Sequence, residues 1–161
     1  MENSVSVKSI LLTSAGQITK ISEASLKEYL AKMELLAWKM NAFLVERDDI
    51  LELMGGTEDI AMIKDHYNNH IQFMASILQT PDIETLVETV LWVFRTYIAK
   101  GYSSNYFSCQ IDTWRENLKE NVSEKAFSEI FSIYDWFNVN IPYFTIAANE
   151  SIAAAKHLGN D

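Results

Sequence analysis

The stretch Leu86-Val-Glu-Thr-Val-Leu-Trp-Val-Phe-Arg-Thr-Tyr-Ile-Ala99 decides the fold, because nearly all of its side chains are apolar. Drawn as a helix over residues 81–100, the segment has apolar side chains over about two-thirds of its circumference. Such a helix is normally covered by other helices on several sides. We therefore expect residues 81–100 to lie sandwiched at the centre of an orthogonal helical packing, which an up-down bundle would rarely need.

Arg95 lies inside this apolar stretch and is the first candidate for a ligand contact. A guanidinium enclosed by apolar groups needs an anion, and its planar fork suits a carboxylate. The alternative is an arginine on the wet edge of the helix, balanced by Glu84 and Glu88. The residues one helical turn away, none of them polar, are Leu91, Trp92, Ile98 and Ala99.

Capping and breaking residues divide the rest of the chain into further helices. Ser25-Leu-Lys-Glu28 reads as a capping box, and Gly55-Gly56 ends the segment that it begins. Thr57 is placed as the cap of a helix over about 58–79, and Pro81 as the first residue of the 81–100 helix. Gly101 then fits the position just after that helix.

The C-terminal third is read in the same way. Ser103 or Ser104 begins a helix to about residue 121, and Ser123 caps the last long segment. Pro142 should break or kink that segment, leaving a final helical stretch over residues 143–158. Residues 1–21 form a weakly patterned N-terminal extension before a helical core over 22–158. We predict one all-α domain over 1–161 with six to eight helices.

Composition excludes several classes of function. The chain of 161 residues is 48% hydrophobic, which suits one compact domain. Its net charge of −9 argues against non-specific binding to nucleic acid or anionic lipid. No segment approaches the apolar length of a membrane span, and the N-terminus does not resemble a signal peptide. With a single cysteine, these features predict a cytoplasmic protein.

Two histidines one turn apart form the second candidate site. On a helical wheel, His70 lies near the centre of an apolar arc that includes Tyr67, and His66 lies on its flank. The pair could begin a metal site, but no third ligand is in phase with it. The other interpretations are a core histidine bonded internally and the polar lining of a pocket. We include His70 and Tyr67 among the candidate ligand-binding residues.

Other chemistries lack their usual residues. The Glu-x-x-His pairs of di-iron bundles are absent, and no histidine lies between His70 and His157 to ligate haem. Cys109 has no histidine in its own helix, and no glycine-rich phosphate loop is present. We therefore expect no haem, no metal and no catalysis. Arg47, which neighbours Asp48 and Asp49, is the second choice for an anion anchor.

A homodimer through the last two long helices is also predicted. Outward apolar residues on adjacent helices mark an association surface, and a two-fold axis would make it self-complementary. The residues that do not all fit one inward stripe are Trp114, Ile133, Trp136 and Ile141.

Two segments carry a family resemblance: Ile98-Ala-Lys-Gly-Tyr-Ser-Ser-Asn-Tyr-Phe-Ser-Cys-Gln-Ile-Asp-Thr-Trp114 and Glu129-Ile-Phe-Ser-Ile-Tyr-Asp-Trp-Phe-Asn-Val-Asn-Ile141. In helix lengths and aromatic placement they resemble the last two helices of non-haem globin sensor domains. Those domains occur in stressosome scaffold proteins and in a sporulation sensor histidine kinase of bacilli. The resemblance is closest to small plasmid-encoded sporulation inhibitors and covers roughly residues 22–158.

The resemblance implies a globin-like fold without haem and a regulatory function. Its sporulation branch holds a fatty acid in a hydrophobic tunnel, where an arginine and a chloride ion engage the carboxyl group. Carried over, the arginine would be Arg95, with Arg47 as the fallback. The chain shows no kinase domain, so it would inhibit sporulation by sequestering a signal or by pairing with a sensor histidine kinase. A ligand-free helical dimerisation protein is the main alternative, and a haem or metal redox protein is the third.

Overall fold

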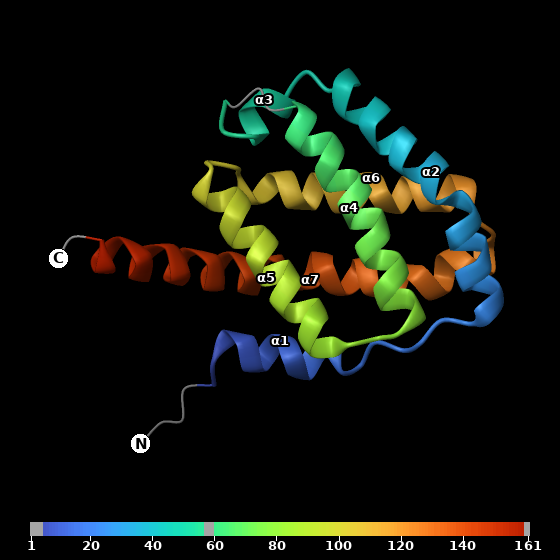
Figure 1. Cartoon of the computed structure of the whole chain (residues 1–161), viewed down its shortest axis with the longest axis horizontal. Coiled ribbons are helices and arrows are strands. Elements are labelled where there is room, and N and C mark those ends of the chain that lie inside the picture. The colour runs from blue at the N-terminus through green and yellow to red at the C-terminus, as the bar shows by residue number, and fades with distance from the viewer. Residues whose placement is uncertain (1–4, 57–59, 160–161) are drawn as a thin grey trace.

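Helices make up most of the described chain in the computed structural model, which describes residues 5–56 and 60–159 (Figure 1). Within these ranges no strand occurs, so the all-α prediction of six to eight helices is confirmed. The predicted cap at Thr57 lies outside the described residues. The helices are α1 (Val7–Ala15), α2 (Glu23–Glu46), α3 (Ile50–Leu53), α4 (Ile60–Gln79), α5 (Ile83–Ala99), α6 (Ser104–Asn121) and α7 (Glu124–Leu158).

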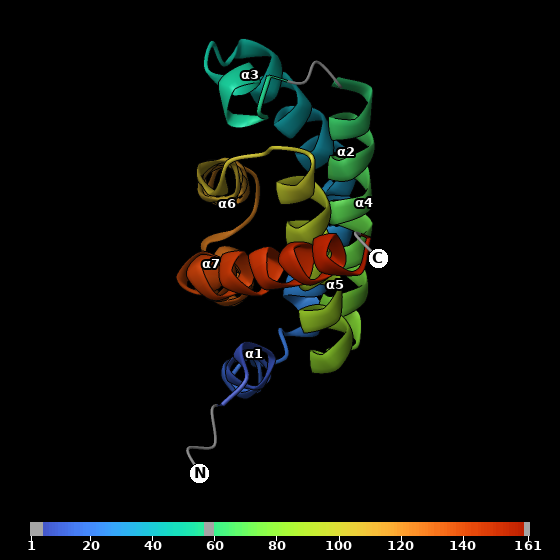
Figure 2. The same ribbon diagram turned by 90° about the vertical axis from the view of Figure 1, so that its left-hand side faces the viewer.

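The long helices form two crossed layers. Figure 2 shows α1, α7 and α6 nearly end-on in one layer, while α2, α4 and α5 run up the other. The layers meet through contacts of α5 with α7 and α1, and of α2 with α6 and α7. Within the first layer α6 packs beside α7, and within the second α2 packs beside α4. The hydrophobic core lies between the layers, where each amphipathic helix buries its apolar face.

Hydroxyl and carboxylate caps set where the helices begin. Ser103 and Ser123 cap α6 and α7 as predicted. The predicted start of α5 is wrong by two residues, because the Asp82 side chain accepts from the Thr85 amide at 3.0 Å and Pro81 precedes the cap. Gly101 follows α5 with a positive φ of 97°, as a glycine after a helix does.

The predicted capping box at Ser25 is also wrong, since α2 begins one turn earlier with Ser22 as its cap. Tertiary contacts explain the difference. The Ser22 hydroxyl donates to Glu129 of α7 at 2.8 Å, and the buried Ser25 hydroxyl donates to the same carboxylate. In return, Glu28 of α2 accepts from the Ser123 amide at 2.9 Å. Each helix therefore supplies the carboxylate that satisfies the start of the other.

Helix α5 is buried on one side only, so the prediction of a sandwiched helix holds in part. Phe94 is 4% exposed and faces the core. Trp92, two residues away, is 55% exposed. The apolar arc read from the sequence is wider than the surface that neighbouring helices cover.

Of the break or kink predicted at Pro142, the break is wrong, because α7 runs through this residue as one helix of 35 residues. Proline lacks the N–H that would bond the carbonyl of Asn138, one turn earlier. Asn138 and Pro142 are both exposed, so water can bond that carbonyl. No helix within the described residues is long and apolar enough to cross a bilayer.

The residues chosen for a dimer surface are mostly core residues, which corrects that part of the prediction. Trp114, Ile133 and Trp136 are 1%, 2% and 7% exposed, and Ile141 is half-buried. Trp136 turns toward α1, where its indole N–H donates to the Ser14 hydroxyl at 2.9 Å. Helix α1 covers the face of α7 that the sequence left unpartnered.

Candidate functional site

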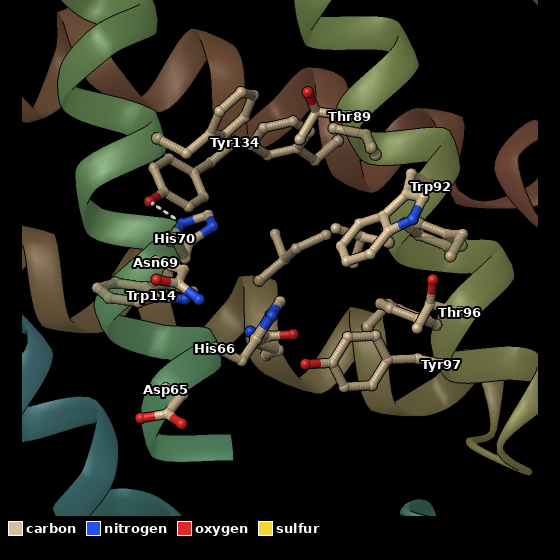
Figure 3. Close-up of a pocket in the computed structure, with 18 of the residues that line it drawn as sticks. Asp65, His66, Asn69, His70, Thr89, Trp92, Thr96, Tyr97, Trp114 and Tyr134 are labelled. Atoms are coloured by element: carbon tan, nitrogen blue, oxygen red, sulfur yellow. Dashed lines mark hydrogen bonds between the residues drawn. The ribbon is translucent and has the colours of Figure 1, made fainter. Parts of the chain in front are cut away.

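A cavity of about 350 Å³ opens between α4, α5, α6 and α7 (Figure 3). This volume lies at the lower end of the range for small-molecule sites, roughly 300–1,000 Å³. Its wall is mostly apolar and draws on all four helices. The apolar lining includes Phe73, Val90, Phe94, Phe107, Ile111 and Phe137.

Helix periodicity brings these side chains to one place. On α5, residues three and four apart share a face, so Val90, Phe94 and Tyr97 all line the cavity. Phe94 stacks on Phe107 of α6 with ring centroids 3.9 Å apart and planes 14° apart. This stacked pair fixes α5 against α6 along one wall.

A polar group sits on the α4 side of the cavity. His70 Nε2 lies 2.8 Å from the hydroxyl of Tyr134 on α7, and the His70 ring lies 4.8 Å from the Trp114 ring on α6. Burial, with a smaller contribution from the neighbouring His66, lowers the pKa of His70 to about 3. His70 is therefore a neutral imidazole near pH 7.

His66, one turn before His70, extends this polar wall. Its ring meets the Tyr97 ring edge-on at a centroid distance of 4.8 Å. Burial lowers the pKa of His66 to about 4, so this ring is also neutral near pH 7. The cavity thus presents two uncharged imidazoles, which can exchange hydrogen bonds but cannot balance an anion.

The charged residues in the described lining of the cavity lie where it meets solvent. Lys100, at the end of α5, and Asp65, on α4, both line it and are exposed. The exposed Asn69 lies on the same side, and Trp92 lies across from it on α5 (Figure 3). Among the described lining residues, Lys100 is the only lysine or arginine. A carboxylate in the cavity would therefore find its cation at the mouth.

The four residues predicted to bind a ligand are not brought together. His70 lines the cavity and is bonded internally, which joins two of the interpretations left open by the sequence. Tyr67 is buried, but it faces a separate hollow of about 20 Å³ that Arg47 and Cys109 also line. Arg47 is exposed and pairs with Asp49 at 2.8 and 2.6 Å, so it does not reach the cavity.

Arg95 lies on the exposed face of α5 and is not among the residues that line the cavity, so of the two alternatives the structure favours the arginine on the wet edge of the helix. Its neighbours Trp92 and Ala99 are exposed as well, and Leu91 and Ile98 are half-buried. Apolar neighbours along the chain do not make a buried environment when no second helix covers them. Because its guanidinium is exposed to water, Arg95 needs no anion from inside the protein.

Cys109 is the single cysteine of the chain, and it is partly buried. Burial raises the pKa of the Cys109 thiol despite the nearby Arg47, so the reactive thiolate is disfavoured. No three metal-ligating side chains gather in the residues that the structure describes.

The sequence missed the residues that complete the polar wall. Nothing in the sequence showed that Trp114 and Tyr134 both face His70. Comparison with protein-family models, curated proteins and solved structures finds no match for this chain. The resemblance to non-haem globin sensor domains therefore stays a prediction, and the site is interpreted from its own geometry.

Proposed function

We propose that this chain is a non-catalytic ligand-binding domain that holds a fatty acid in the cavity lined by α4, α5, α6 and α7. The observation that carries the proposal is a mostly apolar cavity of about 350 Å³ with one cation, Lys100, at its mouth. The hydrocarbon chain would lie against Phe73, Phe94 and Phe107, where each buried methylene contributes about 0.8 kcal/mol. The carboxylate would stay near Lys100 in partial contact with water.

Filling the cavity tests this proposal. Val93 lines the cavity, so Val93→Trp should abolish the binding of decanoic acid measured by isothermal titration calorimetry. Val45→Trp makes the same change at a position that is 70% exposed and outside the cavity lining, and should leave binding intact. Equal binding by both variants would reject the cavity as the site.

The head-group contact has its own test. Lys100→Gln should weaken decanoic acid binding about two- to fivefold, as expected for an exposed ion pair, and should affect decanol less. Arg95→Gln should leave both affinities unchanged, because Arg95 does not line the cavity. The chloride ion implied by the resemblance is tested separately, by comparing binding in chloride and in sulfate buffers.

The regulatory part of the proposal rests on the family resemblance. We propose that the domain inhibits sporulation by sequestering the signal of a sensor histidine kinase or by pairing with that kinase. Overexpression should lower sporulation in a strain that has the kinase. Equal repression in a strain without the kinase would count against this function.

A ligand-free interaction protein is the second candidate, and exposed apolar residues favour it. On α7, Val139 and Ile146 are 64% and 46% exposed and lie on one face with the partly exposed Tyr143. This face would serve the proposed homodimer in place of the buried tryptophans. A monomeric mass at micromolar concentration, together with no lipid released on denaturing extraction, would reject the dimer and the ligand alike.

A further inference from the structure

The inner end of the cavity, where the wall is most buried, contains a hydrogen-bond donor that no described residue satisfies. The Nε1–H of Trp114 is buried and has no hydrogen-bond partner in the described chain, and the Trp114 residue is 1% exposed. Trp114 also lines the cavity. An unmade bond at a buried donor costs stability, so such a group beside a cavity indicates an acceptor that arrives with a ligand.

A second donor follows from the pairing of His70 with Tyr134. Tyr134 is 1% exposed, and His70 Nε2 is the only hydrogen-bond partner of its hydroxyl in the described residues. If Nε2 carried the proton, the tyrosine O–H would be buried without an acceptor. The hydroxyl therefore donates to Nε2, and the ring proton lies on Nδ1. Figure 3 shows this second nitrogen turned toward the cavity.

Charge decides which acceptor fits these two donors. The buried part of the wall consists of Trp114 and Tyr134, with two neutral, partly exposed histidines beside them, while Asp65 and Lys100 are at the solvent-facing mouth. A carboxylate at the inner end would be buried without a cation, which is costly. A carbonyl oxygen accepts two hydrogen bonds without bringing a charge.

We propose that the inner end of this cavity binds an uncharged carbonyl oxygen, so that the ligand is a keto fatty acid with its carboxylate at the mouth. This inference rests on the proposed function, because it specifies the ligand class for the same cavity. Trp114 and His70 would each donate one hydrogen bond to the ketone. The hydrocarbon between the two polar ends would lie along the aromatic wall.

The test compares three acids of equal length by calorimetry on the full chain. They are decanoic acid, the keto acid whose carbonyl adjoins its terminal methyl group, and a keto acid with a mid-chain carbonyl. The terminal keto acid should bind about three- to tenfold more tightly than decanoic acid, as one or two net hydrogen bonds allow. The mid-chain isomer should show no such gain, because its oxygen does not reach the inner end.

Trp114→Phe removes the indole N–H and keeps an aromatic ring. In this variant the affinity ratio of the terminal keto acid to decanoic acid should fall toward one, whereas Trp38→Phe, at a site 66% exposed, should preserve it. NMR gives a readout on the unaltered protein. The indole N–H signal of Trp114, identified by its loss in Trp114→Phe, should move downfield with the terminal keto acid and not with decanoic acid.

The outcomes separate the two proposals. Decanoic acid binding with no preference for the terminal keto acid overturns the carbonyl site and leaves the proposed function standing. Decanoic acid affinity that rises about tenfold for each unit fall in pH would show proton uptake with an inner carboxylate, and this also overturns the carbonyl site. Failure of all three acids to bind rejects the proposed function and the inference together.

Discussion

Acid should destabilise this protein through His66 and His70 before its carboxyl groups titrate. Burial holds the pKa of His66 at about 4 and that of His70 at about 3, while the unfolded residues titrate at about 6.5. Because the folded pKa values are the lower ones, the stability gained from neutral histidines is complete above about pH 6.5. It is lost as the pH falls from about 6.5 toward the folded values.

The magnitude follows from linkage. Protonation favours an unfolded histidine by about 0.2 kcal/mol at pH 7 and by about 1.4 kcal/mol at pH 5.5, while the folded rings stay neutral at both. Between pH 7 and pH 5.5, each histidine therefore lowers the free energy of unfolding by about 1.2 kcal/mol, and the pair lowers it by about 2.4 kcal/mol. For a domain of this size, that lowers the melting temperature by roughly 5–10 °C.

Urea unfolding followed by circular dichroism at pH 7 and pH 5.5 measures this loss. The variant carrying His66→Gln and His70→Gln should lose most of the pH dependence, because neither position can then titrate. His157→Gln, on the exposed end of α7, serves as the matched control and should behave as the wild type. An unchanged pH dependence in the double variant would refute the assignment of two histidines that stay neutral in the folded protein.

Three further predictions concern the fold. Gly55→Ala should lower the free energy of unfolding in urea titrations more than Gly56→Ala does. Both glycines have a positive φ, which costs an alanine about 1–2 kcal/mol at either position. Only at Gly55 would the added Cβ meet a backbone atom, the Gly101 carbonyl oxygen, at 2.2 Å. The backbone movement that this contact forces would disturb the nearby hydrogen bond from the Ser103 amide to the Leu53 carbonyl, so Gly55→Ala should lose about 0.5–1.5 kcal/mol more than Gly56→Ala. Equal losses of stability in the two variants would contradict this reasoning. Phe94→Ala should cost about 3–5 kcal/mol, against less than about 1 kcal/mol for the exposed Trp92→Ala, and similar costs would show that the sides of α5 are misassigned. Trp136→Phe should cost about 0.5–1.5 kcal/mol by removing the bond to Ser14, and hydrogen exchange in α1 should rise; unchanged protection of α1 would argue against this anchor.

Local signals in the sequence were sufficient for helix existence and for some caps. Ser103, Ser123 and Gly101 act through contacts within a few residues, so they can be read without the fold. The start of α2 could not be read in this way. Ser25 has the right local pattern for a cap, but its hydroxyl is taken by Glu129, a residue more than a hundred positions away.

In the candidate site, too, some residues could be identified from a single helix and others only from the packing of several helices. His70 could be identified because it lies on the apolar arc of its own helix. Tyr134 and Trp114 complete its surroundings from α7 and α6, and no spacing in the sequence relates those helices to α4. For Arg95 the sequence left two alternatives open. Its neighbours are apolar, yet exposure depends on whether another helix covers that face, and none of the described helices does.

The sequence by itself determined that this protein is a helical domain with a large apolar interior and a histidine pair on one core-facing arc. These properties depend on periodicity and composition, which are local or summed along the chain. Only the tertiary structure decided which faces meet, where packing stays incomplete and leaves a cavity, and which charged residues reach its mouth. Those outcomes depend on how side chains from distant segments fit together, and a difference in fit is not encoded in any one segment.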